Sequence, residues 1–339
     1  MMFIEWEPRN LMIMVGVVLG LIYGVIAQST RFCVRRAISD LADNRGTQRL
    51  SSWLSAIAMA MLGTQILIAY DLLDISQTPY APQSMGLLSF IGGAAIFGIG
   101  MNLTRGCPAR LLVLSGQGNF RAVYGFIIVG ISGYLVFKGM AATERLALQS
   151  IAPHTFGFST IGSLFDGTMM LAGVIIIVLA MIMAALRLGR LQDVLSGSFI
   201  GAIISLAWFV TIIVGSDDFD PIAPQSLSFV APIGEAIVYV MLASGYGANF
   251  AVGIVGGVLT GSLISATVRR ELKLETFSTP QDHFLYTLGA IMMGVGGIFA
   301  LGCSTGQGIT GLATLSPWSL LATVTIFVAG FFSQKFLKR

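Results

Sequence analysis

Charge is scarce in this chain. Only 10% of its 339 residues are Asp, Glu, Lys or Arg, whereas 55% are apolar and the mean hydropathy is +0.85. This composition excludes a disordered chain and argues against a water-soluble domain. It is typical of an all-α integral membrane protein, and we expect a single polytopic domain over residues 1–339 within the lipid bilayer. The net charge of +3 gives no sign of a nucleic-acid partner.

Histidine and cysteine are scarcer still, and the few that are present are too scattered for several kinds of chemistry. The two histidines, His154 and His283, lie in loops without the spacing of a metal site. Three cysteines far apart in the sequence do not suggest a disulfide framework. The sequence contains no HExxH, GxSxG, Walker or dinucleotide-binding motif. We therefore predict no catalytic residue, no metal and no cofactor.

Long apolar stretches are what the chain has in abundance. A membrane-spanning helix needs roughly 17–25 mostly apolar residues. About nine stretches meet this requirement, at residues 11–27, 52–70, 87–103, 121–137, 167–186, 194–214, 250–267, 284–301 and 318–334. A further apolar stretch, 233–244, is too short to cross and predicts a re-entrant half-helix or broken helix.

The basic residues predict the orientation of the chain in the membrane. Five arginines lie within 31–49, and further basic residues lie at 187–190, 269–273 and 335–339. The loops 71–86 and 215–232 contain aspartates but no Lys or Arg. Basic loops stay in the cytoplasm. We therefore expect a multi-pass protein of the cell inner membrane, with its N-terminus outside and its C-terminus in the cytoplasm.

Repeated patterns indicate a two-fold internal repeat, with one half in residues 1–140 and the other in 166–339. Two glycine ladders have the same four-residue spacing, and both precede basic clusters: Gly16, Gly20 and Gly24, then Gly253, Gly257 and Gly261. The pair Gly-Cys also occurs twice after a glycine-rich span. Whether the repeats are inverted or parallel stays open. Small residues every four positions also let helices approach closely in lipid, so helix packing is the alternative explanation of the ladders.

The first candidate site surrounds Cys107, which lies between Gly106 and Pro108 after an apolar span. Proline favours the first turn of a new helix, so we predict that Cys107 begins a half-helix inside the membrane. Free N–H groups and the helix dipole favour an anion there. Arg105 and Arg110 flank the thiol, and arginine at membrane depth is a functional candidate by default. The alternative is that both arginines only mark the cytoplasmic side.

A second candidate site repeats this arrangement without the arginines. Its polar and glycine residues follow an apolar span and include Gly302, Cys303, Ser304, Thr305 and Gln307. Irregular polar backbone at membrane depth is tolerated only where it is buried in protein or lines a cavity. The sequence therefore predicts a second broken helix that lines a substrate pathway.

The third thiol, Cys33, lies in a different setting. It sits in the arginine-rich run 31–36 at the cytoplasmic end of the first span, where it could pass a soft anion at the inner mouth. We expect it to stand apart from the symmetry of the other two. The alternative for each cysteine is a small apolar filler. Burial in an apolar core is expected to keep the thiols neutral.

At these residues the chain resembles the YeeE/YedE family of sulfur-compound transporters, whose best understood members import thiosulfate. The matching segments are Arg31–Cys33, Gly106–Pro108, Leu301–Gly308 and Thr279–Asp282. The resemblance implies an hourglass-shaped pathway in which the three cysteines relay a sulfur anion inward. It also implies a cytoplasmic sulfur-carrier protein as a partner. Other members of the family are associated with selenium metabolism.

These observations predict a transporter rather than an enzyme, importing thiosulfate or a related soft sulfur anion through a central cysteine relay. A membrane thiol oxidoreductase or sulfur transferase is one alternative, but it would need a paired or resolving cysteine and usually a quinone or flavin site. A non-transporting membrane subunit is the other, although such a subunit has no need of polar broken helices. No coupling ion is indicated, and Glu235 is the nearest candidate for a proton relay.

Overall fold

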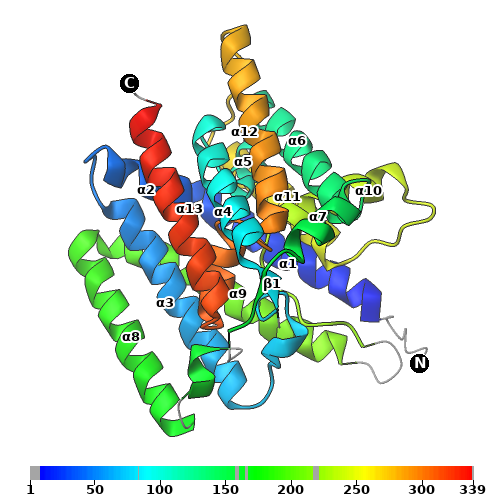
Figure 1. Ribbon diagram of the computed structural model, residues 1–339. Coiled ribbons are helices and arrows are strands. Elements are labelled where there is room, and N and C mark those ends of the chain that lie inside the picture. The colour runs from blue at the N-terminus through cyan, green and yellow to red at the C-terminus, as the bar shows by residue number, and fades with distance from the viewer. Residues whose placement is uncertain (1–7, 83, 157–159, 165–166, 217–220, 338–339) are drawn as a thin grey trace, which may run out of the picture.

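The protein is a bundle of long helices interrupted by short ones (Figure 1). The computed structural model describes residues 8–82, 84–156, 160–164, 167–216 and 221–337. Within them, nine helices are long and apolar enough to cross a membrane, as the sequence predicts. They are α1 (Pro8–Ser29), α3 (Gln48–Ala69), α4 (Leu87–Leu103), α6 (Phe120–Phe137), α8 (Gly167–Leu188), α9 (Leu191–Gly215), α11 (Phe250–Val268), α12 (Pro280–Phe299) and α13 (Pro317–Phe336).

Short elements fill the breaks between the long helices. They are α2 (Val34–Ala42), α5 (Pro108–Gly116), α7 (Ala142–Gln149), α10 (Val230–Met241), the π-helical η3 (Gly306–Gly311), and the 3₁₀ turns η1 (Ile75–Gln77) and η2 (Ile161–Leu164). The apolar stretch at 233–244 thus belongs to a helix of 12 residues, too short to cross. Two short strands, β1 (Met85–Gly86) and β2 (Pro153–His154), pair antiparallel.

The two glycine ladders lie against each other. Helices α1 and α11 run in parallel, and each ladder faces the backbone of the other helix. A Cβ atom added at Gly16, Gly20 or Gly24 would lie 2.5 Å from a carbonyl oxygen of α11. The ladders therefore bring two helices to a distance that no larger side chain allows.

The remaining long helices pack in related pairs. Helix α3 runs parallel to α9, where Gly201 lies against the Ala56 carbonyl oxygen. Helix α6 runs parallel to α12 through Gly133 and Gly294, and α4 runs parallel to α13. Helices α4 and α12 pack antiparallel at the centre. These close pairs surround α5 and η3, most of whose residues are buried, so these two breaks face protein instead of lipid.

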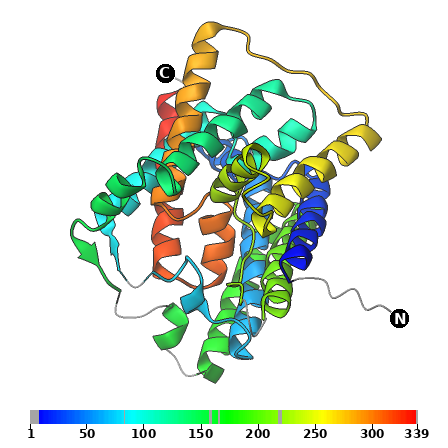
Figure 2. The ribbon, with the colours of Figure 1, turned by 90° about the vertical axis from the view of Figure 1, so that its right-hand side faces the viewer.

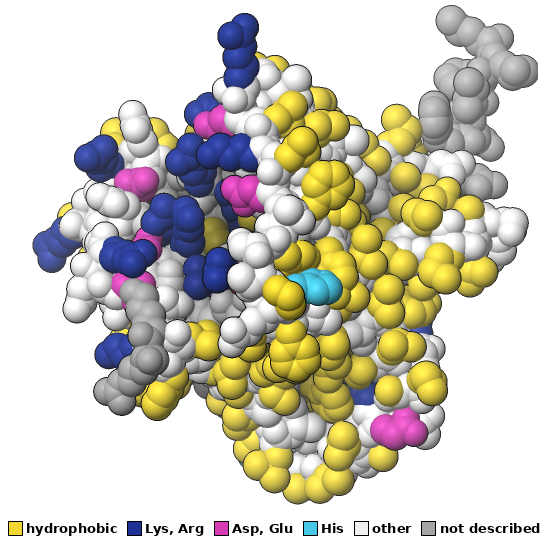
Figure 3. Space-filling view, turned by 90° about the horizontal axis from the view of Figure 1, so that it is seen from above, with side chains coloured by type: hydrophobic (Ala, Val, Ile, Leu, Met, Phe, Trp, Pro, Cys, Tyr) yellow, Lys and Arg dark blue, Asp and Glu magenta, His cyan; other side chains and the backbone are white. Residues whose placement is uncertain are grey.

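Basic side chains gather on one face of the bundle. The C-terminal end of α13 and the first turn of α12 lie at this end, and Figure 2 shows the connection from α11 to α12 running across it. Viewed from this end, Lys and Arg side chains surround a hollow (Figure 3). The connection between α3 and α4 lies at the opposite end (Figure 1). The aspartates at 217–220 and residues 338–339 of the basic tail lie outside the described residues.

Gly257→Ala tests the packing of the ladders. Its methyl group would lie 2.3 Å from the Val17 carbonyl oxygen. Overpacking typically costs about 1–3 kcal/mol, so the detergent-solubilised variant should unfold at a lower temperature. The neighbouring Gly256→Ala is the control, because its Cβ meets nothing within 4 Å. Equal melting temperatures for the two variants would contradict this packing.

Candidate functional site

All three thiols are buried at breaks between a long helix and a short one. Cys33 joins α1 to α2, Cys107 joins α4 to α5, and Cys303 joins α12 to η3. Their exposed fractions are 5%, 2% and 0%. Cys33 stands at the N-terminal cap of α2, as Cys107 does at that of α5, so the local settings of these two thiols are alike.

The same backbone turn precedes each thiol. The residue two positions before each cysteine adopts the left-handed conformation, with φ of 56°, 56° and 55° at Arg31, Arg105 and Leu301. The N–H group of the next residue donates to the carbonyl oxygen five residues earlier, over 3.2, 3.1 and 2.8 Å at Phe32, Gly106 and Gly302. This is the Schellman ending of a helix. It stops the long helix sharply and leaves the thiol at the start of the next segment.

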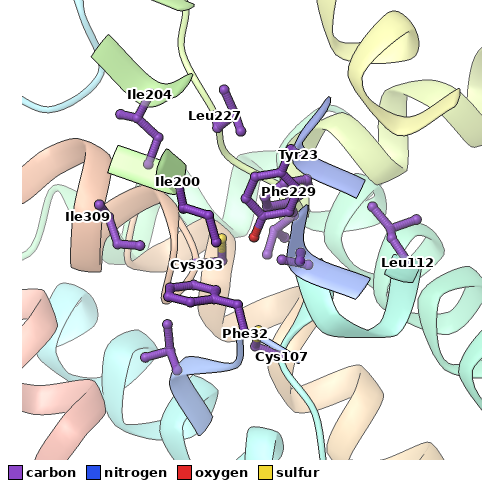
Figure 4. Close-up of a cluster of buried hydrophobic side chains, with 14 of the residues drawn as sticks. Tyr23, Phe32, Cys107, Leu112, Ile200, Ile204, Leu227, Phe229, Cys303 and Ile309 are labelled. Atoms are coloured by element: carbon purple, nitrogen blue, oxygen red, sulfur yellow. The ribbon is translucent and has the colours of Figure 1, made fainter. Parts of the chain in front are cut away.

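Two of the thiols share one small, tightly packed pocket. Cys33 and Cys107 line it, and their side chains interact directly. Other walls of the pocket come from α1, α5 and the turn after Cys303; they are formed by Tyr23, Phe32, Arg110 and Thr305, among others. Figure 4 shows Tyr23, Phe32, Cys107 and Cys303 within one cluster of buried side chains.

The turn after Cys303 carries polar atoms without partners. The Cys303 Sγ accepts a hydrogen bond from the Gly306 N–H at 3.3 Å. Among the described residues, Ser304 Oγ, Thr305 Oγ1 and Gln307 Oε1 are buried and make no hydrogen bond. Each unsatisfied buried polar group costs about 1–3 kcal/mol. Polar ligands or ordered waters in this turn would satisfy all three groups.

The hydroxyl groups of Ser304 and Thr305 lie in two different pockets. Thr305 lines the thiol pocket, whereas Ser304 lines a second small pocket beside Trp53 and Thr323. Gln307 is anchored through its Nε2, which donates to the Ala300 carbonyl oxygen at 2.7 Å. The Gln307 side-chain amide is therefore held through its nitrogen, whereas its Oε1 makes no hydrogen bond to a described residue.

The predicted glycines and proline shape the turns without contributing polar side chains. Pro108 occupies the first turn of α5, as expected. Gly106 and Gly302 each precede a thiol, and a Cβ at Gly302 would lie 3.1 Å from the Gln307 Cγ. Their small size lets the chain reverse inside a packed core.

The two arginines beside Cys107 lie in different places. Arg110 lines the thiol pocket, and its Nη1 donates to the Ala27 carbonyl oxygen at 3.3 Å. The Arg105 side chain is 64% exposed, and its Nη2 lies 3.3 Å from the Asp282 Oδ1. The same carboxylate also pairs with Arg121. Arg110 therefore belongs with the thiols, and Arg105 belongs to the basic face.

A cavity of about 180 Å³ lies on the other side of the Cys303 turn and reaches Leu301 and Gly302. Tyr80, Ser228 and Arg145 line it, and sequence analysis singled out none of these three. The Arg145 Nε is buried and makes no hydrogen bond among the described residues. Burial lowers the pKa of Arg145, yet an arginine side chain stays charged at physiological pH.

The remaining candidates lie away from the thiols. Glu235 accepts a hydrogen bond from the Asn249 Nδ2 at 2.8 Å and lies 3.9 Å from the Lys138 Nζ. It is thus engaged in local contacts. His283 packs against Phe277 and His154 against Phe156. The described residues contain no group of metal-ligating side chains.

Comparison with known proteins agrees with this geometry. A family model described as sulphur transport matches residues 29–332. The chain belongs to the sulphur transport family. This membership confirms the resemblance to the YeeE/YedE family and identifies the chain as a multi-pass membrane protein of a transporter family rather than an enzyme.

Two relatives of the sulphur transport family show how far the similarity extends. The thiosulfate transporter TsuA of Spirochaeta thermophila is 22% identical, over 94% of this chain and 97% of its own length. The thiosulfate transporter TsuA of Escherichia coli is also 22% identical, over 91% of this chain and 90% of its own. Together with the family they support a transporter of sulfur anions.

Arg110→Gln and Arg105→Gln separate the two arginines experimentally. Loss of the Arg110 charge should reduce uptake of the sulfur anion at least tenfold, because hydrogen bonds to charged groups contribute about 1.5–3 kcal/mol. Arg105→Gln should change uptake less than about twofold, because exposed ion pairs contribute little. Initial rates in cells with matched protein amounts measure both. A greater loss in the Arg105 variant would place the pathway elsewhere.

Proposed function

We propose that this protein imports thiosulfate, or a closely related soft sulfur anion, across the cell inner membrane through its three thiols. The observation that carries the proposal is the set of unpaired buried hydroxyl and amide groups beside Cys303. Such groups are costly unless a ligand meets them. Their position beside three buried thiols supports a substrate with both oxygen and sulfur to offer.

The route we propose has three stages. The anion first occupies the cavity beside Arg145, which we place on the outer side and which Leu301 and Gly302 also line. It then passes Cys303 to the pocket of Cys33 and Cys107. From there it leaves by the basic face (Figure 3). Several weak sites in succession allow binding and release in turn, which is what passage requires.

The chemistry of the thiols suits this substrate. A neutral S–H group donates a weak hydrogen bond to the terminal sulfur of thiosulfate, whereas a thiolate would repel the dianion. The sulfonate oxygens accept stronger hydrogen bonds from hydroxyl and backbone N–H groups. The relay therefore needs no covalent step.

The helix pairs support a repeat of inverted topology, with halves at 1–140 and 166–339. If α1 corresponds to α9 and α3 to α11, the α1–α11 contact becomes the α3–α9 contact. In the same way the α4–α13 contact becomes the α6–α12 contact. Cys107 then corresponds to Cys303, and Cys33 to Phe229 at the start of α10. Such repeats with broken helices are common in transporters.

The basic face supports the remaining parts of the proposal. A cytoplasmic location of this face places the N-terminus outside and the C-terminus inside. The hollow ringed by Lys and Arg offers a docking surface for an acidic sulfur-carrier protein that accepts the anion. Pull-down of such a carrier by the solubilised transporter, with loss of binding at high salt, is the expected result.

One observation favours a sulfur transferase as the second candidate. Cys33 and Cys107 adjoin, and an adjacent pair of thiols can resolve a persulfide. Mass spectrometry of protein taken during turnover distinguishes the two functions. Transport predicts unmodified thiols, whereas a persulfide on either cysteine would favour transfer.

Replacement of the thiols tests the proposed relay. Cys107→Ala and Cys303→Ala should each remove most thiosulfate uptake in cells that depend on this protein for sulfur, because the sulfur end loses its donor. Growth on thiosulfate as the sulfur source provides the measurement, and growth on sulfate controls for general fitness. Unchanged uptake in the Cys107 variant would end the relay hypothesis.

Arg145→Gln tests the outer stage. Loss of its charge should raise the KM for external thiosulfate about tenfold, since a hydrogen bond to a charged group contributes about 1.5–3 kcal/mol. Lys138→Gln is the matched control, because Lys138 pairs with Glu235 and does not line the cavity. Transport assays over a range of external concentrations give both values. A similar KM in wild type and Arg145→Gln would remove this stage from the route.

A further inference from the structure

Tyr23 is a buried polar side chain at the meeting point of the three thiols. It lies on α1, one turn before Ala27, and is 1% exposed. Its ring packs against Phe229 at 5.2 Å between centroids. It lines the pocket of Cys33 and Cys107 and is within electrostatic range of all three thiols. Figure 4 shows its hydroxyl directed toward the side where Cys303 and Cys107 lie.

Thr305 faces the same pocket from another wall. Its side chain is also 1% exposed, and its hydroxyl faces that of Tyr23, although its Oγ1 meets no described residue in good hydrogen-bond geometry. Arg110 adds a guanidinium group, held by the Ala27 carbonyl oxygen at 3.3 Å. The pocket therefore has two kinds of wall. One consists of thiols, which suit soft sulfur, and the other of hydroxyl and guanidinium donors, which suit anionic oxygen.

We propose that the hydroxyl groups of Tyr23 and Thr305 bind the oxygens of a sulfur oxyanion while its terminal sulfur faces Cys33 and Cys107. This inference rests on the proposed function and specifies the substrate class of its inner site. An anion with oxygens at one end and a bare sulfur at the other satisfies both walls. Sulfate lacks the soft end, and hydrosulfide lacks the oxygens, so each leaves one wall unpaired.

Two isosteric substitutions test this assignment. Tyr23→Phe removes only the phenolic hydroxyl, and Thr305→Val replaces the hydroxyl by a methyl group. Each should raise the KM for thiosulfate at least about tenfold, the loss typical of one hydrogen bond to an ion. Because the Thr305 hydroxyl faces the Tyr23 hydroxyl and makes no other hydrogen bond to a described residue, its replacement should change the melting temperature only slightly. If the Thr305 hydroxyl served only the fold, Thr305→Val would keep the wild-type KM and melt at a lower temperature.

Matched controls are available on other helices. Tyr286 is 3% exposed and packs against Phe277 outside the thiol pocket. Thr64 is 0% exposed, and its Oγ1 also lacks a partner. Tyr286→Phe and Thr64→Val should therefore keep the wild-type KM. Radiolabelled thiosulfate uptake by purified protein in proteoliposomes measures all four variants, with melting temperatures taken in detergent.

The outcomes separate this inference from the proposed function. A raised KM in Thr305→Val and Tyr23→Phe, with unchanged controls, supports it. If wild-type protein transports thiosulfate and Thr305→Val keeps the wild-type KM, the oxygen-binding wall is wrong and the transport function stands. An equal rise in the controls also overturns it. If Tyr23→Phe does not fold, Thr305→Val decides alone. Absence of uptake by wild-type protein would instead overturn the proposed function.

Discussion

A broken helix inside a membrane protein leaves backbone and side-chain polar groups that lipid cannot hydrogen-bond, and the rest of this structure depends on meeting that constraint. The glycine ladders of α1 and α11 help to meet this constraint because they allow the two helices to pack closely. The Schellman turns meet it locally by pairing backbone groups at the end of each long helix. Three of the buried side-chain atoms that stay unpaired lie in one turn beside Cys303, on Ser304, Thr305 and Gln307. Unpaired polar groups destabilise a core without a ligand, but in the proposed pathway they are free to bind the anion.

Much of the fold and part of the site follow from the sequence alone. Length and hydropathy predict the nine spans, and Gly106 with Pro108 marks the break at Cys107. The matching turn at Cys33 has no such signal, because Phe32 and Val34 flank this thiol in place of a glycine and a proline. Arg31 also adopts the left-handed conformation without being glycine. The contact between the ladders was also beyond the sequence, since four-residue spacing serves a repeat and a helix pair equally well. Tyr23 and Arg145 carry no motif, and only the three-dimensional fold brings them to the proposed pathway.

The arginines of this protein occupy two different kinds of position, at the surface and in pockets. Arg31 and Arg105 lie at the surface, where ion pairs with Glu271 and Asp282 hold the connections between helices. Arg110 instead lines the thiol pocket, and Arg145 lines the cavity that reaches Leu301 and Gly302. Arginine suits such positions because its charge is permanent and its donors can bind an oxyanion at two points. The proposed route thus has a cationic group on each side of the Cys303 turn, with thiols and hydroxyls between them.

The central claim is that this protein alone carries thiosulfate through a buried path of thiols and hydroxyls. Uptake of radiolabelled thiosulfate into proteoliposomes that contain only the purified protein tests it most directly, with excess unlabelled sulfate or selenite as competitors. The account predicts saturable uptake that excess sulfate leaves nearly unchanged, because sulfate has no soft end for the thiols; selenite shows whether the path also admits selenium oxyanions. Uptake no greater than in protein-free liposomes, or equal inhibition by sulfate and unlabelled thiosulfate, would contradict it.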